Sequence, residues 1–358
     1  MNTKNARHSR FLPAGWSCAP ALVALLGLFL GADAASSATL IVLNKSDNTA
    51  SLLDASSGKV LSTVPTGAGP HEVAVSPDGK TAVVSDYGTQ DEPGKTLTVI
   101  DVAARKTLKT IDLGEYRRPH GIAWLEADQV AVTTEGSKSL VIVDVKAGKV
   151  LRAIPTDQDV SHMVALAPKH GRAFVANIGS GSVTVIDLER GRRVANIETG
   201  KGAEGIAVSP DQREVWVTNR EANTVSILDA ASLEVAATLE SKAFPIRVKF
   251  TPDGKHALVS NARSGDVAVF DTATRREVQR VPMNVEAKKD ATGAVRLFGK
   301  QFGQSPVPVG ILVVPELQRA FVANTNADII SVIDLETWQI IDRLSAGKEP
   351  DGLGYSNL

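Results

Sequence analysis

The sequence has 358 residues, of which 43% are hydrophobic and 22% charged, and its 39 basic residues nearly balance its 40 acidic ones. This composition is too apolar for a disordered chain, and the balanced charge provides no basic excess for binding nucleic acid. The single cysteine, Cys18, excludes an internal disulfide and a thiolate-rich metal site. The several long apolar segments of a multi-pass membrane protein are also missing from the sequence.

The first 34 residues have the pattern of an export signal. Three basic residues precede an apolar stretch from residue 19 to 32, and Ala-Asp-Ala at 32–34 has the small residues typical of a cleavage site. The apolar stretch is shorter than the roughly 20 residues that a spanning helix needs. We therefore expect a cleaved Sec-type signal peptide over 1–34, no membrane span, and a periplasmic or secreted single domain over 35–358.

A unit of about 42 residues recurs along the remainder of the chain. Its clearest phrase is an apolar alternation that ends in aspartate, at Asp54, Asp101, Asp144, Asp187, Asp229, Asp271 and Asp334. The spacings between these aspartates are 47, 43, 43, 42, 42 and 63 residues. Units of this length that contain four short strands are typical of the blades of a β-propeller.

Each unit predicts four strands, A to D, in chain order. In one unit they are VAVS at 73–76, TAVVSD at 81–86, TLTVID at 96–101 and TLKTIDL at 107–113, separated by turn residues such as Pro-Asp-Gly. The repeats begin at a strand B over 39–44 and end at the opening of a further unit over 347–358. We therefore predict an all-β, seven-bladed propeller of four-stranded antiparallel blades, in which the C-terminal strand joins the N-terminal blade and closes the ring.

Three longer phrases carry a family resemblance. They are AVSPDGKTAVVSD at 74–86, FVANIGSGSVTVIDLERGR at 174–192 and VWVTNREANTVSILDAASLEV at 215–235. These phrases resemble the YVTN-repeat (YncE-like) β-propeller family, and the resemblance covers residues 38–358. It implies a secreted or periplasmic protein, and as a likeness of fold it extends to the haem-binding propeller of dissimilatory nitrite reductase and to propeller lactonases. Since the motif is structural, the resemblance implies the fold and leaves the chemistry open.

Two longer connections fall on the same predicted face of the ring. The connection from strand D to the next strand A is extended at 282–308, and the connection from strand B to strand C is extended at 87–95. The turns between strands A and B, on the other face, stay short. Because loops on rigid scaffolds carry function, we expect the functional site on the face formed by the D–A and B–C connections.

Three histidines occupy the same position at the start of strand A in successive units. They are His71, His120 and His162; the next unit has Glu204 there, and the closing strand has Asp351. We expect these side chains to meet at the mouth of the central channel, where three imidazoles and Glu204 would suit Zn, Cu or Fe. The same histidines also suit a polar small-molecule pocket, or a structural role between neighbouring strands.

Other polar residues are expected on that face. Arg118, Arg247, Arg220 and Tyr87 are candidates for binding a small anion, because arginine offers a two-pronged donor. Glu72 and Asp351 are candidates for a general base. A uniform series ends each strand B, at Asn44, Asp86, Glu135, Asn177, Asn219, Asn261 and Asn324. We interpret that series as turn capping, not ligand binding.

Two functions follow from this sequence. The first is a secreted or periplasmic binding propeller, monomeric, that takes a small anionic ligand, a cofactor or a partner protein at the channel mouth and binds no nucleic acid. The alternative is a metal-dependent enzyme, lactonase-like, lyase-like or redox, that uses His71, His120, His162 and Glu204. A divalent transition metal (Zn, Cu or Fe) is the expected cofactor in that case. The absence of C-x-x-C-H excludes covalent c-type haem and leaves non-covalent haem open.

Overall fold

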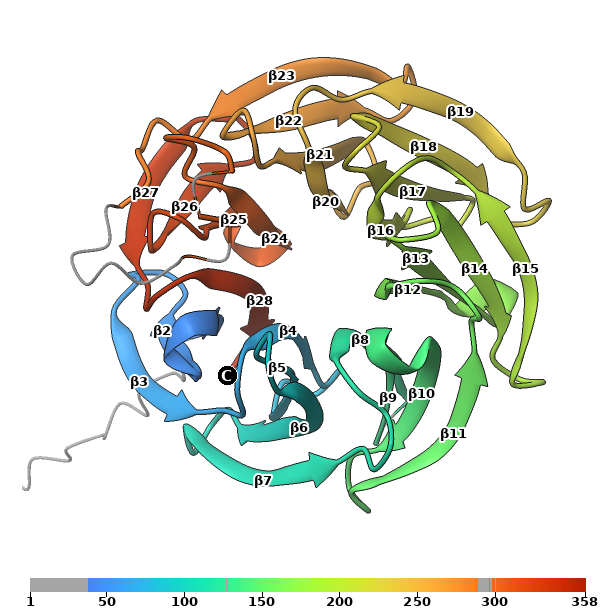
Figure 1. Cartoon of the computed structure of the whole chain (residues 1–358). Helices are drawn as coiled ribbons and strands as arrows, with labels where there is room; N and C mark the ends of the chain where they lie inside the picture. Colours follow the sequence, from blue (N-terminus) through green and yellow to red (C-terminus); the bar gives the residue numbers. More distant parts are fainter. Residues whose placement is uncertain (1–37, 127, 289–295, 297, 300) are drawn as a thin grey trace, which may run out of the picture. The chain divides into compact units, whose positions relative to one another are not determined.

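The computed structural model describes residues 38–126, 128–288, 296, 298–299 and 301–358 (Figure 1). These residues all belong to one compact unit, Ser36–Leu358. The predicted signal peptide, 1–34, lies outside the described residues. Among the described residues, 3-10 helices occur at η1 (Lys45–Asp47), η2 (Glu135–Ser137), η3 (Pro168–His170) and η4 (Pro315–Leu317).

The strands of the described residues form seven four-stranded antiparallel sheets, which confirms the predicted propeller. From the innermost strand outward, blade 1 is β28 (Pro350–Ser356), β1 (Thr39–Asn44), β2 (Thr49–Asp54) and β3 (Val60–Pro65); blade 2 is β4 (Pro70–Val75), β5 (Thr81–Gly88), β6 (Pro93–Asp101) and β7 (Lys106–Asp112). Blade 3 is β8 (Pro119–Glu126), β9 (Gln129–Thr134), β10 (Ser139–Asp144) and β11 (Lys149–Pro155).

Blades 4 to 7 repeat the same order. Blade 4 is β12 (Ser161–Ala167), β13 (Arg172–Asn177), β14 (Ser182–Asp187) and β15 (Arg192–Glu198); blade 5 is β16 (Ala203–Val208), β17 (Glu214–Asn219), β18 (Thr224–Asp229) and β19 (Val235–Glu240). Blade 6 is β20 (Pro245–Phe250), β21 (His256–Asn261), β22 (Asp266–Asp271) and β23 (Arg276–Pro282); blade 7 is β24 (Pro308–Val314), β25 (Arg319–Asn324), β26 (Ile329–Asp334) and β27 (Ile340–Ser345).

The innermost strands form a closed ring around the centre of the unit. Each of them contacts the innermost strand of the next blade, and β28 contacts both β24 and β4 (Figure 1). Within blade 1, β28 pairs antiparallel with β1, so that Leu40 faces Tyr355. The Thr39 hydroxyl also donates a hydrogen bond to the carbonyl of Leu358 at 2.6 Å. The C-terminal strand therefore closes the ring, as predicted.

The hydrophobic core lies between the faces of adjacent blades. Strands alternate side chains between their two faces, so each middle strand contributes apolar residues to two interfaces. For example, Trp216 on β17 is fully buried and contacts Phe250 and Phe270 of the next blade, with ring centroids 5.6 and 6.2 Å away. An apolar cluster occupies each interface between consecutive blades. This packing fixes the inner strands and hence the rim where they begin.

The predicted B–C loop at 87–95 is mostly strand. Strand β5 continues to Gly88 and β6 begins at Pro93, and these two residues pair with each other. The backbone N–H of Thr89 donates to the carbonyl of Glu92 at 2.9 Å and closes the hairpin. The extra residues of this blade therefore lengthen a hairpin, which brings Tyr87 to the mouth of the ring on a rigid strand.

Asparagine at the end of a strand B ties that strand to its neighbours. The Asn44 amide donates to Thr49 and Ser51 at 3.0 and 2.9 Å, and its carbonyl oxygen accepts the Gly347 N–H at 2.9 Å. Asn219 donates to Thr224 and Ser226 in the same way. The predicted capping role is therefore confirmed for these residues.

The capping interpretation is wrong for Glu135. In blade 3 the equivalent position is Thr134, which pairs with Ser139 as Asn177 pairs with Ser182. Glu135 lies one residue further on and begins η2. Its side chain is therefore free of the turn and points to the neighbouring inner strand, where it hydrogen-bonds His162.

In blade 2 the capping position is an aspartate. Burial raises the pKa of Asp86 to about 6, although hydroxyls of Thr96 and Thr98 and the N–H of Gly67 donate to the carboxyl. The folded state thus holds this proton more tightly than the unfolded state does. The resulting stabilisation is complete below about pH 4 and is lost as the pH rises through about 6. At neutral pH the buried, ionised carboxylate therefore lowers the stability of the fold.

Asp86→Asn is expected to raise the free energy of unfolding at pH 7.5 by up to about 3 kcal/mol, because asparagine is neutral and repeats the bonding of Asn219. The gain should disappear near pH 4, where Asp86 is itself protonated. Urea-induced unfolding of both proteins at the two pH values measures this. A gain that is equal at both pH values would show that charge is not its cause.

Glycine lets adjacent inner strands approach each other. A Cβ on Gly352 would collide with the carbonyl oxygen of His71 on β4, whereas one on Gly354 would lie 3.1 Å from a Val73 methyl group that can move. We expect Gly352→Ala to lower the free energy of unfolding by about 1–3 kcal/mol and Gly354→Ala by clearly less. Thermal unfolding of the two variants compares them, and equal losses would contradict the close-approach explanation.

Candidate functional site

The start of each inner strand contributes to one cavity at the mouth of the ring. The second residues of β4, β8, β12, β16 and β28 are His71, His120, His162, Glu204 and Asp351, and all five are buried. They line a cavity of about 240 Å³ together with Arg220 and Arg247. The repeat thus brings side chains from five blades to the same place, which we refer to as the mouth pocket.

A second set of residues, at the ends of four strands B, lies against the first set, and two of its members, Lys45 and Arg220, also line the mouth pocket. The residue that follows the capping position is Lys45 in blade 1, Tyr87 in blade 2, Glu135 in blade 3 and Arg220 in blade 5. Each contacts a residue of the first set or its immediate neighbour. Lys45 and Glu135 were not among the residues expected from the sequence. The signal that could have found them is their shared position in the repeat, one residue after the capping residue.

His120, Glu135 and His162 form a compact group with metal-ligating chemistry. One possible ligand atom from each residue lies within 4.8 Å of the other two, and all three residues are substantially buried. The rings of His120 and His162 are tilted against each other with centroids 3.6 Å apart. Two imidazoles with one carboxylate are a common donor set for Zn and Fe(II) sites that keep an open coordination position.

Glu135 is held in place from its other side. Its Oε1 lies 2.5 Å from His162 Nδ1, and its Oε2 accepts the Tyr87 hydroxyl at 2.6 Å. Burial, together with the charge of Glu135, raises the pKa of Tyr87 above its ordinary value, so the phenol stays protonated and keeps donating. Tyr87 therefore positions the carboxylate of Glu135 against the histidines.

Glu204 lies next to the group of His120, Glu135 and His162, and contacts His162 from the side opposite Glu135. Its Oε1 is 3.5 Å from His162 Nε2 and 3.3 Å from Arg247 Nη1, and its Oε2 accepts Arg220 Nη1 at 2.9 Å. Burial alone would raise the pKa of Glu204, but His162 and the two arginines outweigh it and bring the pKa to about 2. An ionised carboxylate on the far nitrogen of a ligating histidine is a common second partner in metal sites.

The three histidines differ in protonation. Burial lowers the pKa of His71 and of His120, so both rings are neutral at physiological pH. Burial also lowers the pKa of His162, but the hydrogen bond and charge of Glu135, together with the nearby carboxylate of Glu204, raise it to a net value above the ordinary one. His71 Nδ1 hydrogen-bonds the carbonyl of Gly69 at 2.7 Å, and its ring lies 4.8 Å from that of His120.

Arg247 forms an ion pair across the ring. It lies on β20 in blade 6 and its Nη2 is 2.7 Å from Glu72 Oε1 on β4 in blade 2, a blade that does not adjoin its own. The residue is 4% exposed, and the nearby carboxylates raise the pKa of its guanidinium further despite burial. Asp351 is likewise paired, with Lys45 Nζ 2.5 Å from its Oδ2. The candidate bases Glu72 and Asp351 therefore both sit in ion pairs.

Arg118 lies apart from the residues that line the mouth pocket. Its guanidinium donates to the carbonyls of Thr89 and Gln90 at 3.1 and 3.0 Å, and it stacks 4.9 Å from the centre of the Tyr87 ring. These contacts brace the β5–β6 hairpin against β8. Of the four residues expected to bind an anion, Arg220 and Arg247 line the pocket, whereas Arg118 and Tyr87 support its wall.

One side of the mouth pocket is apolar and includes residues of the long connection at 282–308. Phe298 from that connection lines the pocket with Phe244 and Val309, and Phe302 packs on Phe244 with centroids 4.9 Å apart. Arg296 ties this segment to blade 7 through a two-pronged pair with Asp328 at 2.8 and 2.9 Å. The insertion therefore supplies an aromatic wall opposite the histidines.

Buried polar atoms without partners distinguish the mouth pocket. Among the described residues, four buried polar atoms without a hydrogen bond belong to residues that line it: His120 Nδ1, His162 Nε2, Arg220 Nε and Asp351 Oδ1. Two of these atoms lie near a carboxylate, with His162 Nε2 3.5 Å from Glu204 and Arg220 Nε 4.0 Å from Glu221. Buried polar groups in native structures nearly always have a partner, so unsatisfied ones indicate a missing ligand, ion or water.

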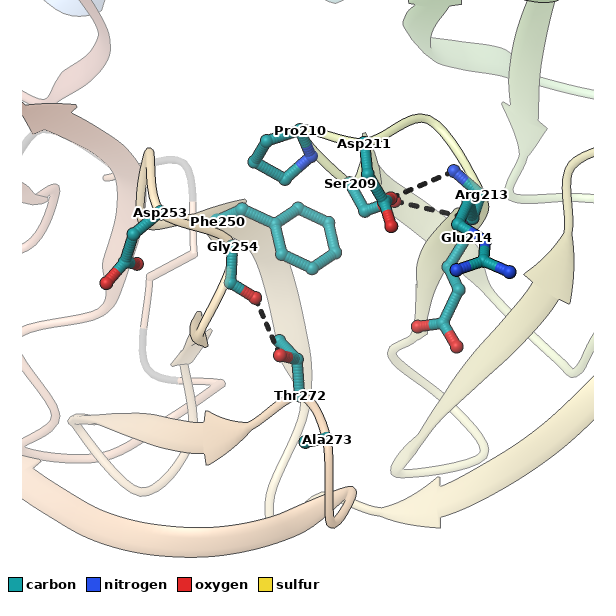
Figure 2. A pocket seen from close by; sticks show the side chains of 10 residues that line it. All are labelled: Ser209, Pro210, Asp211, Arg213, Glu214, Phe250, Asp253, Gly254, Thr272 and Ala273. Atoms are coloured by element: carbon teal, nitrogen blue, oxygen red, sulfur yellow. Dashed lines mark hydrogen bonds between the residues drawn. The ribbon is translucent and has the colours of Figure 1, made fainter.

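A groove on the other face of the ring provides a comparison. It has a volume of about 670 Å³ and lies between blades 5 and 6 (Figure 2). Its polar groups are engaged: Asp211 accepts from Ser209 and from the Arg213 N–H, and the Thr272 hydroxyl donates to Gly254 at 2.6 Å. The larger groove therefore gives no comparable indication of a bound ligand.

Comparisons with known proteins agree with this class of fold. The family model of the cytochrome D1 heme domain matches residues 125–246, about a third of the chain. Among solved structures, the chain is similar to Kuenenia stuttgartiensis hydrazine synthase, with TM-score 0.67 and 20% identity over 83% of this chain and 92% of that one. It is also similar to the dihydro-heme d1 dehydrogenase NirN in complex with DHE, with TM-score 0.61 and 16% identity over 88% and 74%.

A further similar structure is a functionally unknown protein from Desulfotomaculum acetoxidans DSM 771, with TM-score 0.72 and 14% identity over 89% of this chain and 98% of that one. At these identities the solved structures establish the fold: the chain is a seven-bladed β-propeller. A search of curated proteins found no match. Within the described part of the chain, no helix is both long and apolar enough to cross a bilayer.

These likenesses raise haem as a candidate ligand, which can be tested against the described side chains. A cavity of 240 Å³ is smaller than the roughly 300–1,000 Å³ typical of sites for drug-sized molecules. The rings of His120 and His162 also lie close together, with centroids 3.6 Å apart, so a planar macrocycle does not fit between them. The mouth pocket in this geometry is therefore small for a haem, whereas His120, Glu135 and His162 could hold a single metal ion.

Proposed function

We propose that the protein is an exported, ligand-binding propeller that holds one divalent transition metal at its mouth through His120, Glu135 and His162. The observation that carries the proposal is the grouping of their donor atoms within 4.8 Å of one another. The unpartnered His120 Nδ1 supports it, as does the placement of Tyr87 and Glu204 behind Glu135 and His162. Export is supported by the signal-like pattern of residues 1–34.

The donor set indicates which metals would bind. Imidazole nitrogen and carboxylate oxygen suit Zn²⁺, Cu²⁺ and Fe²⁺, and three protein ligands leave a coordination position for a ligand in the mouth pocket. Bound there, the metal would attract an oxygen or nitrogen donor of a small molecule. Because Glu72 and Asp351 are held in ion pairs, the geometry favours binding over catalysis by either carboxylate.

The test is metal titration of the protein purified without a polyhistidine tag and stripped with a chelator. Calorimetry with Zn²⁺ or Cu²⁺ should give one site per chain in the wild type and a loss of that site in His120→Ala and His162→Ala. His170→Ala, an exposed histidine on the other face, is the matched control and should bind like wild type. Wild type without a stoichiometric site, or variants that retain it, would overturn the proposal.

Haem is the second candidate, favoured by the matching cytochrome D1 heme domain model and by the similarity to NirN. Hemin titration followed by absorbance tests it on the same proteins. We expect weak, unsaturable association that is equal in wild type and His120→Ala. A saturable one-to-one complex that His120→Ala abolishes would replace the metal proposal with haem binding, and would show that the mouth pocket rearranges around the ligand.

A further inference from the structure

Two unsatisfied atoms of the mouth pocket are not accounted for by a metal ion. Asp351 Oδ1 is buried without a partner while its other oxygen pairs with Lys45. The lysine and neighbouring positive groups lower the pKa of Asp351 in spite of burial, so this oxygen is a carboxylate oxygen that can only accept. A ligand that satisfies Asp351 must therefore donate a hydrogen bond.

Arg220, in contrast, needs a hydrogen-bond acceptor from the ligand. Its Nη1 donates to Glu204, while its Nε–H is buried without a hydrogen bond, 4.0 Å from the nearest carboxylate oxygen, Oε1 of Glu221. An arginine cannot accept a hydrogen bond, so the group that satisfies this atom must be an acceptor, and an anionic oxygen is the strongest one. The open position of the proposed metal site favours the same kind of group.

The aromatic wall adds an apolar requirement. Phe244, Phe298 and Val309 line the pocket and present no hydrogen-bonding side-chain atom to a ligand. The guanidinium of Arg220 lies 5.4 Å from the ring centre of Phe244, so charged and apolar surfaces meet directly. A volume of 240 Å³ corresponds to roughly eight water molecules at ~30 Å³ each, comparable to a ligand of about nine non-hydrogen atoms.

We propose that the mouth pocket binds a small carboxylic acid that carries an amino or hydroxyl group and a short apolar side chain, an amino acid or a hydroxy acid. The carboxylate meets Arg220 and the metal, the amino or hydroxyl hydrogen satisfies Asp351, and the side chain packs on Phe244 and Phe298. This inference rests on the proposed function, since it uses the same pocket and its metal. It deepens that function by assigning the chemical class of the ligand.

Four probes that share one apolar side chain test the two polar requirements by calorimetry on the Zn²⁺-loaded protein. They are L-leucine, 2-hydroxy-4-methylpentanoate, 4-methylpentanoate and 3-methylbutylamine. We expect leucine or the hydroxy acid to bind at least about tenfold more tightly than 4-methylpentanoate, which lacks the donor, and than 3-methylbutylamine, which lacks the carboxylate. The better of the first two identifies the donor group. Four equal affinities, or no binding of any probe, would overturn the inference.

Substitution of Phe298 tests the apolar wall. Phe298→Ala should weaken leucine binding by about tenfold and leave glycine binding unchanged, because glycine has no side chain to pack on the wall. Val278→Ala is the control. Val278 is 52% exposed on β23, the outermost strand of blade 6, at the opposite edge of the sheet from the inner strand β20. Equal losses for leucine and glycine in Phe298→Ala would contradict a specific role of the wall.

Metal titration of the same preparations separates failure of the inference from failure of the proposed function. If Zn²⁺ binds stoichiometrically and no acid binds, the ligand class is wrong and the metal site stands. If leucine or the hydroxy acid binds with the expected selectivity while Zn²⁺ does not bind, the ligand class stands and the metal site is wrong. Absence of both binding events overturns both.

Discussion

Arg247→Ala should lower the free energy of unfolding by about 3–5 kcal/mol, the typical cost of removing one partner from a buried ion pair. The guanidinium pairs with Glu72 at 2.7 Å and Glu204 at 3.3 Å, and the side chain is 5% exposed. Without it, Glu72 remains in the ring with no arginine across from it, and Glu204 keeps only Arg220 and His162. Urea-induced unfolding followed by tryptophan fluorescence measures the loss.

Two further variants identify the source of this effect. Replacing both partners, in Arg247→Met with Glu72→Gln, removes the positive charge together with the carboxylate, and should cost much less than Arg247→Ala alone. Arg276→Ala, at an exposed arginine on β23, should change stability by no more than about 0.5 kcal/mol. If the double variant is as unstable as Arg247→Ala, the loss comes from packing of the long side chain and not from unpaired charge.

Glu135→Gln is expected to weaken metal binding by more than 100-fold, and Glu204→Gln by about 10–100-fold. The larger loss follows from removing an anionic ligand, which lies 2.5 Å from His162 Nδ1 in the metal-free geometry. The smaller loss follows from weakening the partner that orients His162 through its other nitrogen, 3.5 Å away. Calorimetric titration with Zn²⁺ at fixed pH and ionic strength provides both values.

The order of the two effects is the informative result. The sequence alone points to Glu204 as the fourth ligand, because it occupies the histidine position of the next blade. A greater loss in Glu204→Gln than in Glu135→Gln would support that assignment and would require Glu204 to leave Arg220 and Arg247 when the metal binds. Circular dichroism of both variants confirms that the propeller is intact in the comparison.

The architecture could be predicted from the sequence because each repeat of the sequence corresponds to one structural unit, a blade. Alternation of apolar residues and regular turn signals define four strands in each unit. The incomplete units at 39–44 and 347–358 can each complete a blade only by pairing with the other. The extended hairpin of β5 and β6 was harder to predict from the sequence. Its residues 89–92 are all polar, as in a loop, and only the pairing of Gly88 with Pro93 reveals how far the strands continue.

The site was predictable only where it follows the repeat. The shared position of His71, His120 and His162 placed them at one mouth. Glu135 was missed because blade 3 has threonine at the capping position, so alignment on the last polar residue of strand B shifts this blade by one. That shift separates a capping residue from a proposed metal ligand, and the pairing of Thr134 with Ser139 reveals it.

Other parts of the site depend on side-chain reach, which periodicity does not encode. The pairing of Arg247 with Glu72 joins residues 175 positions apart and in blades that do not adjoin. The position of Phe298 is set by its contact with Phe302 and by the pair of Arg296 with Asp328, within a connection that repeats nowhere else in the chain. Neither contact leaves a pattern in the sequence.

Closure of blade 1 by β28 has a consequence for biosynthesis. Lys45 comes from the first blade to be made and Asp351 from the last strand, and the two meet at 2.5 Å in the mouth pocket. A nascent or C-terminally clipped chain that lacks β28 can form neither the closed ring nor a complete pocket. On the proposed function, ligand capture would therefore need a chain that includes β28, and a bound ligand would in turn hold β28 and the first blade together.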